Sequence, residues 1–227
     1  MYRCCIFDLD GTLLDTLKSL QNSVNATIAH FGFEPIDGDH IKQFVGDGYK
    51  KLVERSLIYC GDGELVHYEE ALELYMKEFS VHVMDEVGPY PGIPELLEYL
   101  KGEQVKIAVL SNKPHEKTLH NIAEIFGADY FDYAAGEREG ILRKPDPAGV
   151  YMIMEELGVG AEECLYVGDT GTDMETGRNA GVDTIGVLWG FRDEQELGSY
   201  HPQYLVREPL EISQIVEQSK KNAVENQ

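Results

Sequence analysis

Basic residues are scarce in this chain of 227 residues, where 19 Lys and Arg stand against 41 Asp and Glu. The formal net charge of −22 argues against nucleic acids and anionic membranes as partners, because so acidic a surface repels both. The sequence also lacks any run of about 18 uncharged apolar residues, which excludes a membrane-spanning helix. Its first apolar run ends at Asp8, so we expect no signal peptide.

Cysteine is also rare, and no two cysteines have CxxC spacing. The seven histidines are scattered, and none forms an HxxxH pair or stands near a cysteine at zinc spacing. We therefore expect neither a zinc site nor a disulfide framework, but a cytoplasmic protein whose reduced cysteines serve in packing.

Apolar residues, by contrast, make up 43% of the chain, which is too many for an acidic disordered protein. A chain of this length buries roughly 70% of its unfolded surface, enough for a full core. The length allows one large domain, or a medium one that carries an insertion.

Five short runs are almost continuously apolar, as expected of strands covered on both faces of a parallel sheet. Helical patterns separate the later runs, with Gly158 and Gly181 as stop signals behind two of them. This alternation predicts an α/β fold with a Rossmann-like, doubly wound parallel sheet. The predicted strands are residues 3–7, 105–111, 130–134, 164–168 and 183–188, and the helices between them are residues 93–101, 116–126, 148–157 and 174–180.

The interval after the first strand is far too long for an ordinary crossover. Its pattern is helical and glycines punctuate it, so we predict a small helical domain of residues 15–85 inserted into a core of residues 1–14 and 86–227. The linkers, at residues 14–16 and 88–91, are expected to let the insertion close over the sheet edge. The predicted helices of the insertion are residues 17–31, 39–45, 49–59 and 64–83.

Two aspartates, Asp8 and Asp10, follow the first predicted strand and lead into a turn at Gly11. Ligands bind at this edge of an open α/β sheet. A helix N-cap or an Asx turn explains one of the two carboxylates but not both. Clustered carboxylates are costly unless a cation neutralises them, and Gly11 would let backbone N–H groups approach an anion closely.

The fourth predicted strand ends in a second pair, Asp169 and Asp173. Alone, this pair is explained equally well by a helix N-cap with an acidic residue in the first turn. Together with the first pair, it places four carboxylates at one sheet edge without a histidine or thiolate beside them. Such oxygen ligands suit Mg²⁺, a hard cation that also binds phosphate.

Two further positions indicate an anion at the same edge. Ser111 ends the second strand and precedes backbone N–H groups that open a helix, which suits a phosphate oxygen, although an ordinary helix cap explains it equally well. Lys144 stands directly before Pro145 and is therefore held more rigidly than most surface lysines. Its charge could bind both a phosphate and a carboxylate.

In this order and spacing, the segments resemble the four motifs of the haloacid dehalogenase (HAD) superfamily of aspartate-nucleophile phosphatases. The resemblance covers nearly the whole chain, and the insertion resembles the helical cap domain of the first type in that superfamily. The motifs in this sequence are Asp8-x-Asp10-Gly11-Thr12, Ser111, Lys144-Pro145 and Gly168-Asp169-x-x-x-Asp173.

The resemblance implies a role for each motif. Asp8 would attack phosphorus and form an aspartyl-phosphate, while Asp10 would protonate the leaving oxygen and later take a proton from water. Mg²⁺ would be held by Asp8, the backbone carbonyl of Asp10 and Asp169, with Asp173 close by or binding through water. Dehalogenases lack an acid at the position of Asp10, so a phosphatase or phosphotransferase is favoured. The residues implied to hold the phosphoryl oxygens are Thr12, Ser111, Asn112 and Lys144.

The cap is expected to select the rest of the substrate. Its turn Gly46-Asp47-Gly48 opens a helix and would point backbone N–H groups, together with Lys50, at a small anion, although a plain turn between helices also explains it. The stretch resembles the cap loop of the phosphoglycolate phosphatase branch. The resemblance thus implies a monomer or homodimer that hydrolyses a small phosphomonoester, with 2-phosphoglycolate as the best single substrate.

Three alternatives remain open at this point. Within the superfamily, the chain could be a β-phosphoglucomutase-like phosphotransferase or a pyrophosphatase. Outside enzymes, it could be an inactive HAD-like binding module. An inactive module is expected to lack a motif carboxylate, whereas all four are present here.

Overall fold

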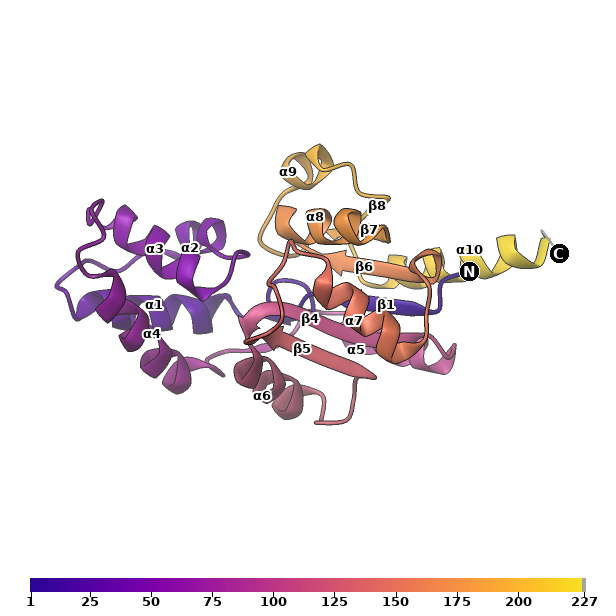
Figure 1. Cartoon of the computed structure of the whole chain (residues 1–227), viewed down its shortest axis with the longest axis horizontal. Coiled ribbons are helices and arrows are strands. Elements are labelled where there is room, and N and C mark those ends of the chain that lie inside the picture. Colours follow the sequence, from indigo (N-terminus) through magenta and orange to yellow (C-terminus); the bar gives the residue numbers. More distant parts are fainter. Residues whose placement is uncertain (226–227) are drawn as a thin grey trace.

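The computed structural model describes residues 1–225, and Figure 1 shows that they form two parts. One part is a sheet with helices on both faces, and the other is a group of helices beyond one end of that sheet. No helix within the described residues is long and apolar enough to cross a membrane.

A six-stranded sheet forms the first part, and every neighbouring pair of its strands is parallel. The strand order is β5-β4-β1-β6-β7-β8, so the first strand of the chain lies near the middle. Phe7, at the end of β1, stands in register with Val109 of β4 and Val167 of β6, which brings the segments after these strands together. The strands are β1 (Cys4–Phe7), β4 (Lys106–Pro114), β5 (Tyr133–Glu137), β6 (Cys164–Gly168), β7 (Asp183–Val187) and β8 (Tyr204–Val206).

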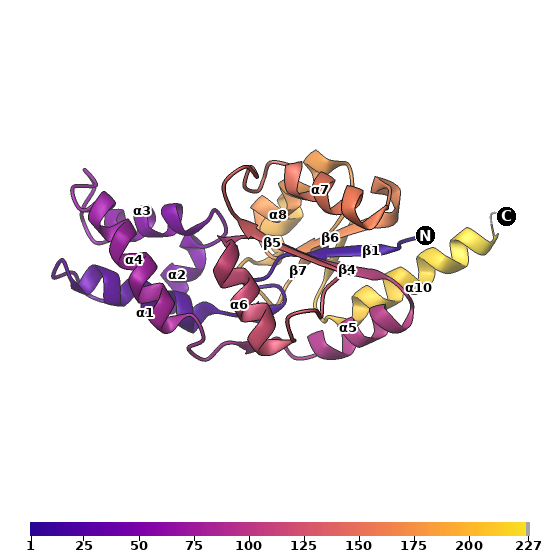
Figure 2. The same cartoon turned by 60° about the horizontal axis from the view of Figure 1, so that its bottom comes forward.

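Helices cover both faces of this sheet, as the apolar strands require (Figure 2). Side chains of α5 and α10 join one hydrophobic cluster, and those of α7 and α8 join a second cluster on the opposite face. The prediction of a doubly wound α/β fold is confirmed. The core helices are α5 (Ile93–Gly102), α6 (His115–Ile125), α7 (Ala148–Leu157), α8 (Gly171–Ala180), α9 (Glu194–Ser199) and α10 (Leu210–Glu225), with a short 3₁₀ turn at Ala161–Glu163.

The third predicted strand begins later than expected, because its first aromatic residues are not in the sheet. Tyr130 and Phe131 pack against the hydrophobic core from a loop, and β5 starts only at Tyr133. Between them, the Asp132 carboxylate accepts a hydrogen bond from the backbone N–H of Ile107 at 2.9 Å. At the start of this strand, the Asp132 side chain thus accepts the Ile107 N–H in place of a backbone carbonyl, and β5 begins only at the next residue.

The four helices α1–α4 have a hydrophobic cluster of their own, separate from the two that flank the sheet. Tyr75 and Phe79 from α4 are its largest fully buried side chains. This separate cluster is what an inserted helical domain requires, while the predicted boundaries at residues 14/15 and 85/86 stay a prediction. The helices are α1 (Leu17–Ala29), α2 (Gly38–Phe44), α3 (Tyr49–Tyr59) and α4 (Tyr68–His82), and we call this group the cap.

The chain crosses between core and cap twice, and the two crossings are paired. β2 (Leu14–Asp15) and β3 (Gly88–Pro89) form a small antiparallel ladder in which Leu14 faces Pro89 and Asp15 faces Gly88. The two predicted linkers are therefore joined to each other.

Arg192 fastens the cap to the core on the other side. It lies between β7 and α9, and its guanidinium donates hydrogen bonds to three backbone carbonyls at the end of α2. Those carbonyls belong to Lys42, Gln43 and Val45, the last of which accepts at 2.8 Å. The last carbonyls of a helix have no partner within it and carry partial negative charge, so a cation is favourable there.

We expect Arg192→Lys to loosen the end of α2, because an ammonium cannot reproduce the planar fork that reaches several carbonyls. A hydrogen bond to a charged group contributes about 1.5–3 kcal/mol, so backbone amides of residues 43–47 should exchange with solvent roughly tenfold faster or more. Hydrogen–deuterium exchange measures this directly. The control is Arg178→Lys on α8, whose side chain is exposed and pairs only loosely with Glu175. Equal exchange in both variants would contradict a fastening role.

Candidate active site

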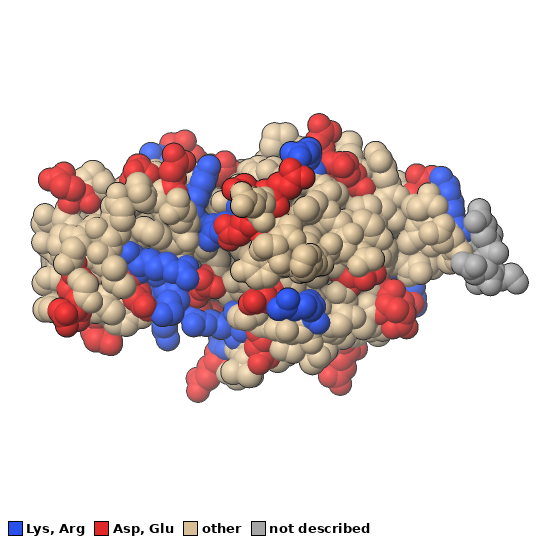
Figure 3. All heavy atoms as spheres, turned by 90° about the horizontal axis from the view of Figure 1, so that it is seen from above, with Lys and Arg blue, Asp and Glu red and all other residues tan. Residues whose placement is uncertain are grey.

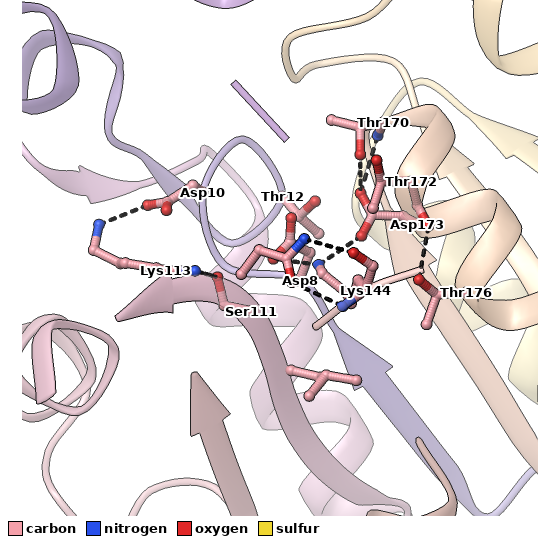
Figure 4. Close-up of polar contacts among 12 residues, drawn as sticks. Asp8, Asp10, Thr12, Ser111, Lys113, Lys144, Thr170, Thr172, Asp173 and Thr176 are labelled. Atoms are coloured by element: carbon pink, nitrogen blue, oxygen red, sulfur yellow. Dashed lines mark hydrogen bonds and ion pairs between the residues drawn. The ribbon is translucent and has the colours of Figure 1, made fainter. Parts of the chain in front are cut away.

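Three buried aspartates, Asp8, Asp169 and Asp173, meet at the carboxyl end of the sheet. Figure 4 shows two of them, Asp8 and Asp173, on either side of Lys144. Asp8 follows β1, Asp169 follows β6 and Asp173 lies in the first turn of α8. One carboxylate oxygen from each lies within 4.8 Å of the others, and all three side chains are buried. The parallel register of the strands therefore gathers carboxylates that are up to 165 positions apart in the sequence.

A single buried lysine lies among these aspartates. The Lys144 ammonium is 2.7 Å from an Asp173 oxygen and 2.9 Å from Asp8 Oδ1. Asp8 Oδ1 accepts no hydrogen bond with good geometry from any described residue, so its contact with Lys144 is electrostatic. One ammonium faces three carboxylates, which leaves an excess of negative charge in a buried volume.

This excess appears in the pKa values. Burial, reinforced by Asp173, raises the pKa of Asp8 to about 7 even though Lys144 opposes the shift. Burial and the charges of Asp173 and Asp8 raise the pKa of Asp169 well above its usual range. Burial alone would lower the pKa of Lys144, but the charges of Asp173 and Asp8 raise it, so the lysine stays protonated. The site as built from protein alone favours a further cation.

The Asp169 carboxylate is held in place on both oxygens. Thr12 donates its hydroxyl to Oδ1 at 2.9 Å, and the backbone N–H of Phe191 donates to Oδ2 at 2.8 Å. Gly11 lies so close that a Cβ there would come within 2.3 Å of Asp169 Oδ2, and its φ of +84° disfavours other residues. The N–H of Gly11 donates to the carbonyl of Leu14. Gly11 and Thr12 thus contact Asp169 of the carboxylate cluster, while their expected contacts with phosphate stay a prediction.

Asp173 is fixed by the start of its own helix. Its Oδ2 accepts hydrogen bonds from both the N–H and the hydroxyl of Thr170, which form a capping box, while Oδ1 accepts from Lys144. Gly168 makes room for this arrangement, since a Cβ there would lie 2.3 Å from the Asp173 side chain. The interpretation of Asp173 as an acidic residue of a helix cap is therefore correct, and the same side chain also belongs to the carboxylate cluster.

Asn112 connects the lysine to the cap. Its side-chain oxygen accepts from the backbone N–H of Lys144 at 2.9 Å, and its Nδ2 donates to the carbonyls of Lys144 and Gly46, each at 3.1 Å. Ser111 lies beside it, and its hydroxyl oxygen accepts from the N–H of Lys113 at 3.2 Å. In this structure Asn112 positions Lys144, and its predicted contact with phosphate is not among its observed partners.

Asp10 points away from the other aspartates and pairs with a residue that sequence reasoning missed (Figure 4). The Lys113 ammonium donates to Asp10 Oδ1 at 2.8 Å, and the lysine side chain is only 1% exposed. The sequence offered one indication, which is that Lys113 comes two residues after Ser111, at the end of β4. The residues around it, however, do not distinguish it from an ordinary surface lysine that precedes a helix.

The predicted cap residues divide into two groups. Gly46 and Gly48 line the same cavity as Asp8 and Asp10. Asp47 instead accepts from Thr172 at 2.7 Å and pairs with Arg55; burial would raise its pKa, but these partners lower it. Lys50 is exposed, with its ammonium 5.9 Å from the centre of the Tyr49 ring. Neither Asp47 nor Lys50 lines the cavity, and their roles in substrate binding stay a prediction.

The cavity lies between cap and core and has a volume of about 40 Å³. Its polar lining comes mainly from the core, with Asp8, Asp10, Ser111, Asn112 and Lys113. Its cap side is mostly apolar, formed by Leu20, Val45, Leu52, Tyr75 and Phe79, among others. This volume has room for about three water-sized groups, so in this arrangement the site fits a small molecule.

Charge on the surface follows a related pattern. Figure 3 shows acidic side chains spread over both parts of the molecule, whereas a group of Lys and Arg side chains gathers where the cap meets the core. Positive side chains are therefore concentrated at the boundary where the site lies, on a face that is otherwise mainly acidic.

The donor set fits a magnesium ion. Carboxylate oxygens are the ligands that Mg²⁺ prefers, and Asp8 and Asp169 carry raised pKa values that a divalent cation would offset. Of the three aspartates, Asp173 is the least free to bind a metal ion, because its two oxygens already accept hydrogen bonds from Lys144 and Thr170. The predicted contribution of the Asp10 backbone carbonyl stays a prediction.

Comparison with known proteins places this geometry in context. The family described as haloacid dehalogenase-like hydrolase matches residues 5–187. A phosphoglycolate phosphatase of Aquifex aeolicus is 33% identical over 217 residues, which cover 95% of this chain and 97% of the relative. Phosphoglycolate phosphatase 1 of Pseudomonas aeruginosa is 32% identical, with 90% and 76% covered. A crystal structure from Lactobacillus delbrueckii subsp. bulgaricus, provisionally named a phosphoglycolate phosphatase, superposes with a TM-score of 0.89 at 32% identity and covers 95% of this chain and 98% of its own.

We expect Mg²⁺ to raise the melting temperature of the protein, because it relieves repulsion among buried carboxylates. At about 100 times its Kd, a ligand adds about 2.7 kcal/mol, which is a rise of roughly 5–10 °C for a chain of this size. Asp169→Asn should raise the melting temperature without metal and abolish the response to Mg²⁺. The control Glu175→Gln removes the same charge from the partly exposed face of α8 and should keep the full response. A full response in Asp169→Asn would show that Mg²⁺ binds elsewhere.

Proposed function

Because this chain belongs to the haloacid dehalogenase-like hydrolase family, we propose that it is a Mg²⁺-dependent phosphatase that hydrolyses a small phosphomonoester through an aspartyl-phosphate. The observation that carries this proposal is that Asp8 and Asp10 line one small cavity while each is paired with a different buried lysine, Asp8 with Lys144 and Asp10 with Lys113. Two carboxylates in different surroundings can take different roles, one as nucleophile and the other in proton transfer.

In the first step, an Asp8 carboxylate oxygen attacks phosphorus. The bond from phosphorus to the leaving oxygen breaks as the bond to Asp8 forms, and Asp10 gives a proton to the leaving oxygen, which departs as an alcohol. Lys144 stays charged next to Asp8, so it favours the ionised nucleophile and stabilises charge that develops on the phosphoryl oxygens.

In the second step, water attacks phosphorus and Asp10 takes its proton. The bond between phosphorus and the Asp8 oxygen breaks, which releases inorganic phosphate and restores the Asp8 carboxylate. Asp10 ends this step protonated, ready to act as the acid in the next turnover. Ser111 lines the same cavity, and in this mechanism its hydroxyl would donate to a phosphoryl oxygen.

Mg²⁺ would be held by Asp8 and Asp169, with Asp173 near it. When bound, it supplies positive charge that orients the phosphoryl group and offsets its negative charge. The protein contributes the fixed positions of the carboxylates, through Thr12 and Phe191 on Asp169 and through Thr170 on Asp173.

We infer that 2-phosphoglycolate is the best single candidate for the substrate. Relatives that align with 90% or more of this chain bear the name phosphoglycolate phosphatase. The cavity, about 40 Å³ in volume, suits a leaving group of two carbons better than it suits a sugar. A phosphotransferase would have to accommodate a second, larger phosphate ester at the same position.

We expect Asp8→Asn to lower kcat for p-nitrophenyl phosphate and for 2-phosphoglycolate by at least about 10³-fold, since an amide cannot act as the nucleophile. The protein should stay folded, because an amide in place of Asp8 also removes a charge that burial disfavours. Steady-state kinetics with Mg²⁺ and a circular dichroism spectrum measure the two expectations. Activity near that of the wild type would overturn the assignment of Asp8.

The intermediate itself is open to a chemical test. Borohydride reduces an acyl phosphate to an alcohol, so wild-type protein quenched during turnover should contain homoserine at position 8. Peptide mass spectrometry identifies that product, because homoserine has one oxygen fewer and two hydrogens more than aspartate. Asp10→Asn serves as the comparison, with p-nitrophenyl phosphate as the substrate because its leaving group departs without a proton. This variant keeps the nucleophile, so it should slow mainly the breakdown of the intermediate and increase the labelled fraction. Active protein without a trace of label at Asp8 would contradict covalent catalysis.

A further inference from the structure

Lys113 is a buried cation with spare capacity to donate hydrogen bonds. An ammonium has three N–H donors, and among the described residues one hydrogen bond, to Asp10, accounts for one of them. Its side chain is 1% exposed and faces the cavity between cap and core. The ammonium also lies 5.0 Å from the centre of the Phe79 ring, so it touches the cap as well as the core.

Tyr75 adds a second polar group to the same cavity. It is fully buried, and its hydroxyl oxygen makes no hydrogen bond to any residue that the structure describes. It stands four residues before Phe79 on α4, and the two rings are stacked with their centres 5.4 Å apart. Phe79 therefore lies against both Lys113 and the Tyr75 ring, and both of these residues line the cavity. The Tyr75 hydroxyl also feels the charge of Asp10, the residue to which Lys113 is bonded.

A buried hydroxyl without a partner is costly, and so is a buried ammonium whose donors are only partly used. Both costs vanish when a ligand brings acceptors to these two groups. Burial raises the pKa of Tyr75, with a further contribution from the nearby charge of Asp10, so its hydroxyl keeps its proton and can donate. An anionic oxygen group satisfies both donors best, because it offers acceptors alone and its hydrogen bonds to an ammonium are stronger than those of a neutral oxygen.

We infer that Lys113 and Tyr75 bind a carboxylate on the leaving group of the substrate, and so select small carboxylated phosphomonoesters. A carboxylate carries one negative charge and fits a cavity of about 40 Å³. A second phosphate group is larger and more highly charged, so the nearby Asp10 carboxylate would repel it more strongly than it repels a carboxylate. This inference rests on the proposed phosphatase function and specifies its substrate class.

The test compares two substrates of nearly equal size: 2-phosphoglycolate, which has the carboxylate, and 2-hydroxyethyl phosphate, which has a neutral hydroxymethyl group instead. We expect the wild type to favour 2-phosphoglycolate in kcat/KM. Lys113→Met and Tyr75→Phe should each reduce kcat/KM for 2-phosphoglycolate by about 10- to 100-fold, the range for losing a hydrogen bond to a charged group. For 2-hydroxyethyl phosphate, Tyr75→Phe should change kcat/KM by less than about threefold.

Lys117→Met is the matched control. Lys117 lies four residues further on, in α6, and its exposed ammonium bonds the Ser80 hydroxyl of the cap outside the cavity. This variant removes the same charge from the same boundary and should keep the preference of the wild type. A preference lost equally in Lys117→Met would indicate a general effect of charge rather than a binding site.

A purely positioning role for Lys113, through Asp10, makes a different prediction. In that case Lys113→Met would lower kcat/KM for both substrates by the same factor, and Tyr75→Phe would leave both unchanged; this result would overturn the inference. Binding gives a second measurement: with Asp8→Asn as background, either substitution should raise the Kd of 2-phosphoglycolate by about 10-fold or more in calorimetry.

Failure of the proposed function would look different again. A wild-type protein that hydrolyses neither p-nitrophenyl phosphate nor any small phosphomonoester with Mg²⁺ would refute phosphatase activity. A wild type that hydrolyses p-nitrophenyl phosphate but treats 2-phosphoglycolate and 2-hydroxyethyl phosphate alike would refute the carboxylate site alone.

Discussion

The site depends on one buried lysine shared between two buried aspartates. Lys144 neutralises part of the charge that Asp8 and Asp173 bring into a volume removed from water, and removing one partner from such a pair typically costs about 3–5 kcal/mol. The remaining carboxylate, Asp169, has no lysine and relies on neutral donors, Thr12 and the N–H of Phe191. The protein alone therefore leaves the cluster with too little positive charge. Its affinity for a divalent cation and for the phosphoryl group follows from this deficit.

Close packing around the cluster explains why small residues surround it. Gly11 and Gly190 both approach Asp169 so closely that a methyl group at either would collide with the carboxylate, and Gly168 stands in the same relation to Asp173. Asn112 bonds both the backbone of Lys144 and the carbonyl of Gly46, so one side chain joins the lysine beside the nucleophile to the cap. The catalytic charges and the cap are thus parts of one hydrogen-bonded structure.

The sequence was sufficient for most of the sheet and for the carboxylates, because both follow from local pattern. Apolar runs end at Asp8 and Asp169, and a parallel sheet brings the ends of its strands together whatever lies between them. It was not sufficient for β8, α9 and α10, whose stretches are short or largely polar and gain their stability from packing against the finished core. Lys113 and Lys50 show the same limit for the site. Each lysine stands near a predicted anion-binding residue, Lys113 near Ser111 and Lys50 near Gly48. Lys113 lies against Phe79 of α4, 34 positions away in the sequence, whereas Lys50 lies near its neighbour Tyr49, and no local pattern distinguishes these two surroundings.

The ladder between β2 and β3 sets how the cap can move. Two separate flexible tethers would let the cap translate and tumble relative to the core, and closing it would cost the entropy of every free dihedral in both. Here Leu14 is paired in register with Pro89 and Asp15 with Gly88, and the N–H of Tyr90 donates to the carbonyl of Leu13 beside them, so the crossings form one two-stranded ribbon. Such a ribbon bends easily across its face and resists sliding along its length. We therefore expect movement of the cap to bend this ribbon rather than to slide one crossing past the other, so that each closure returns the cap to a similar place above the sheet.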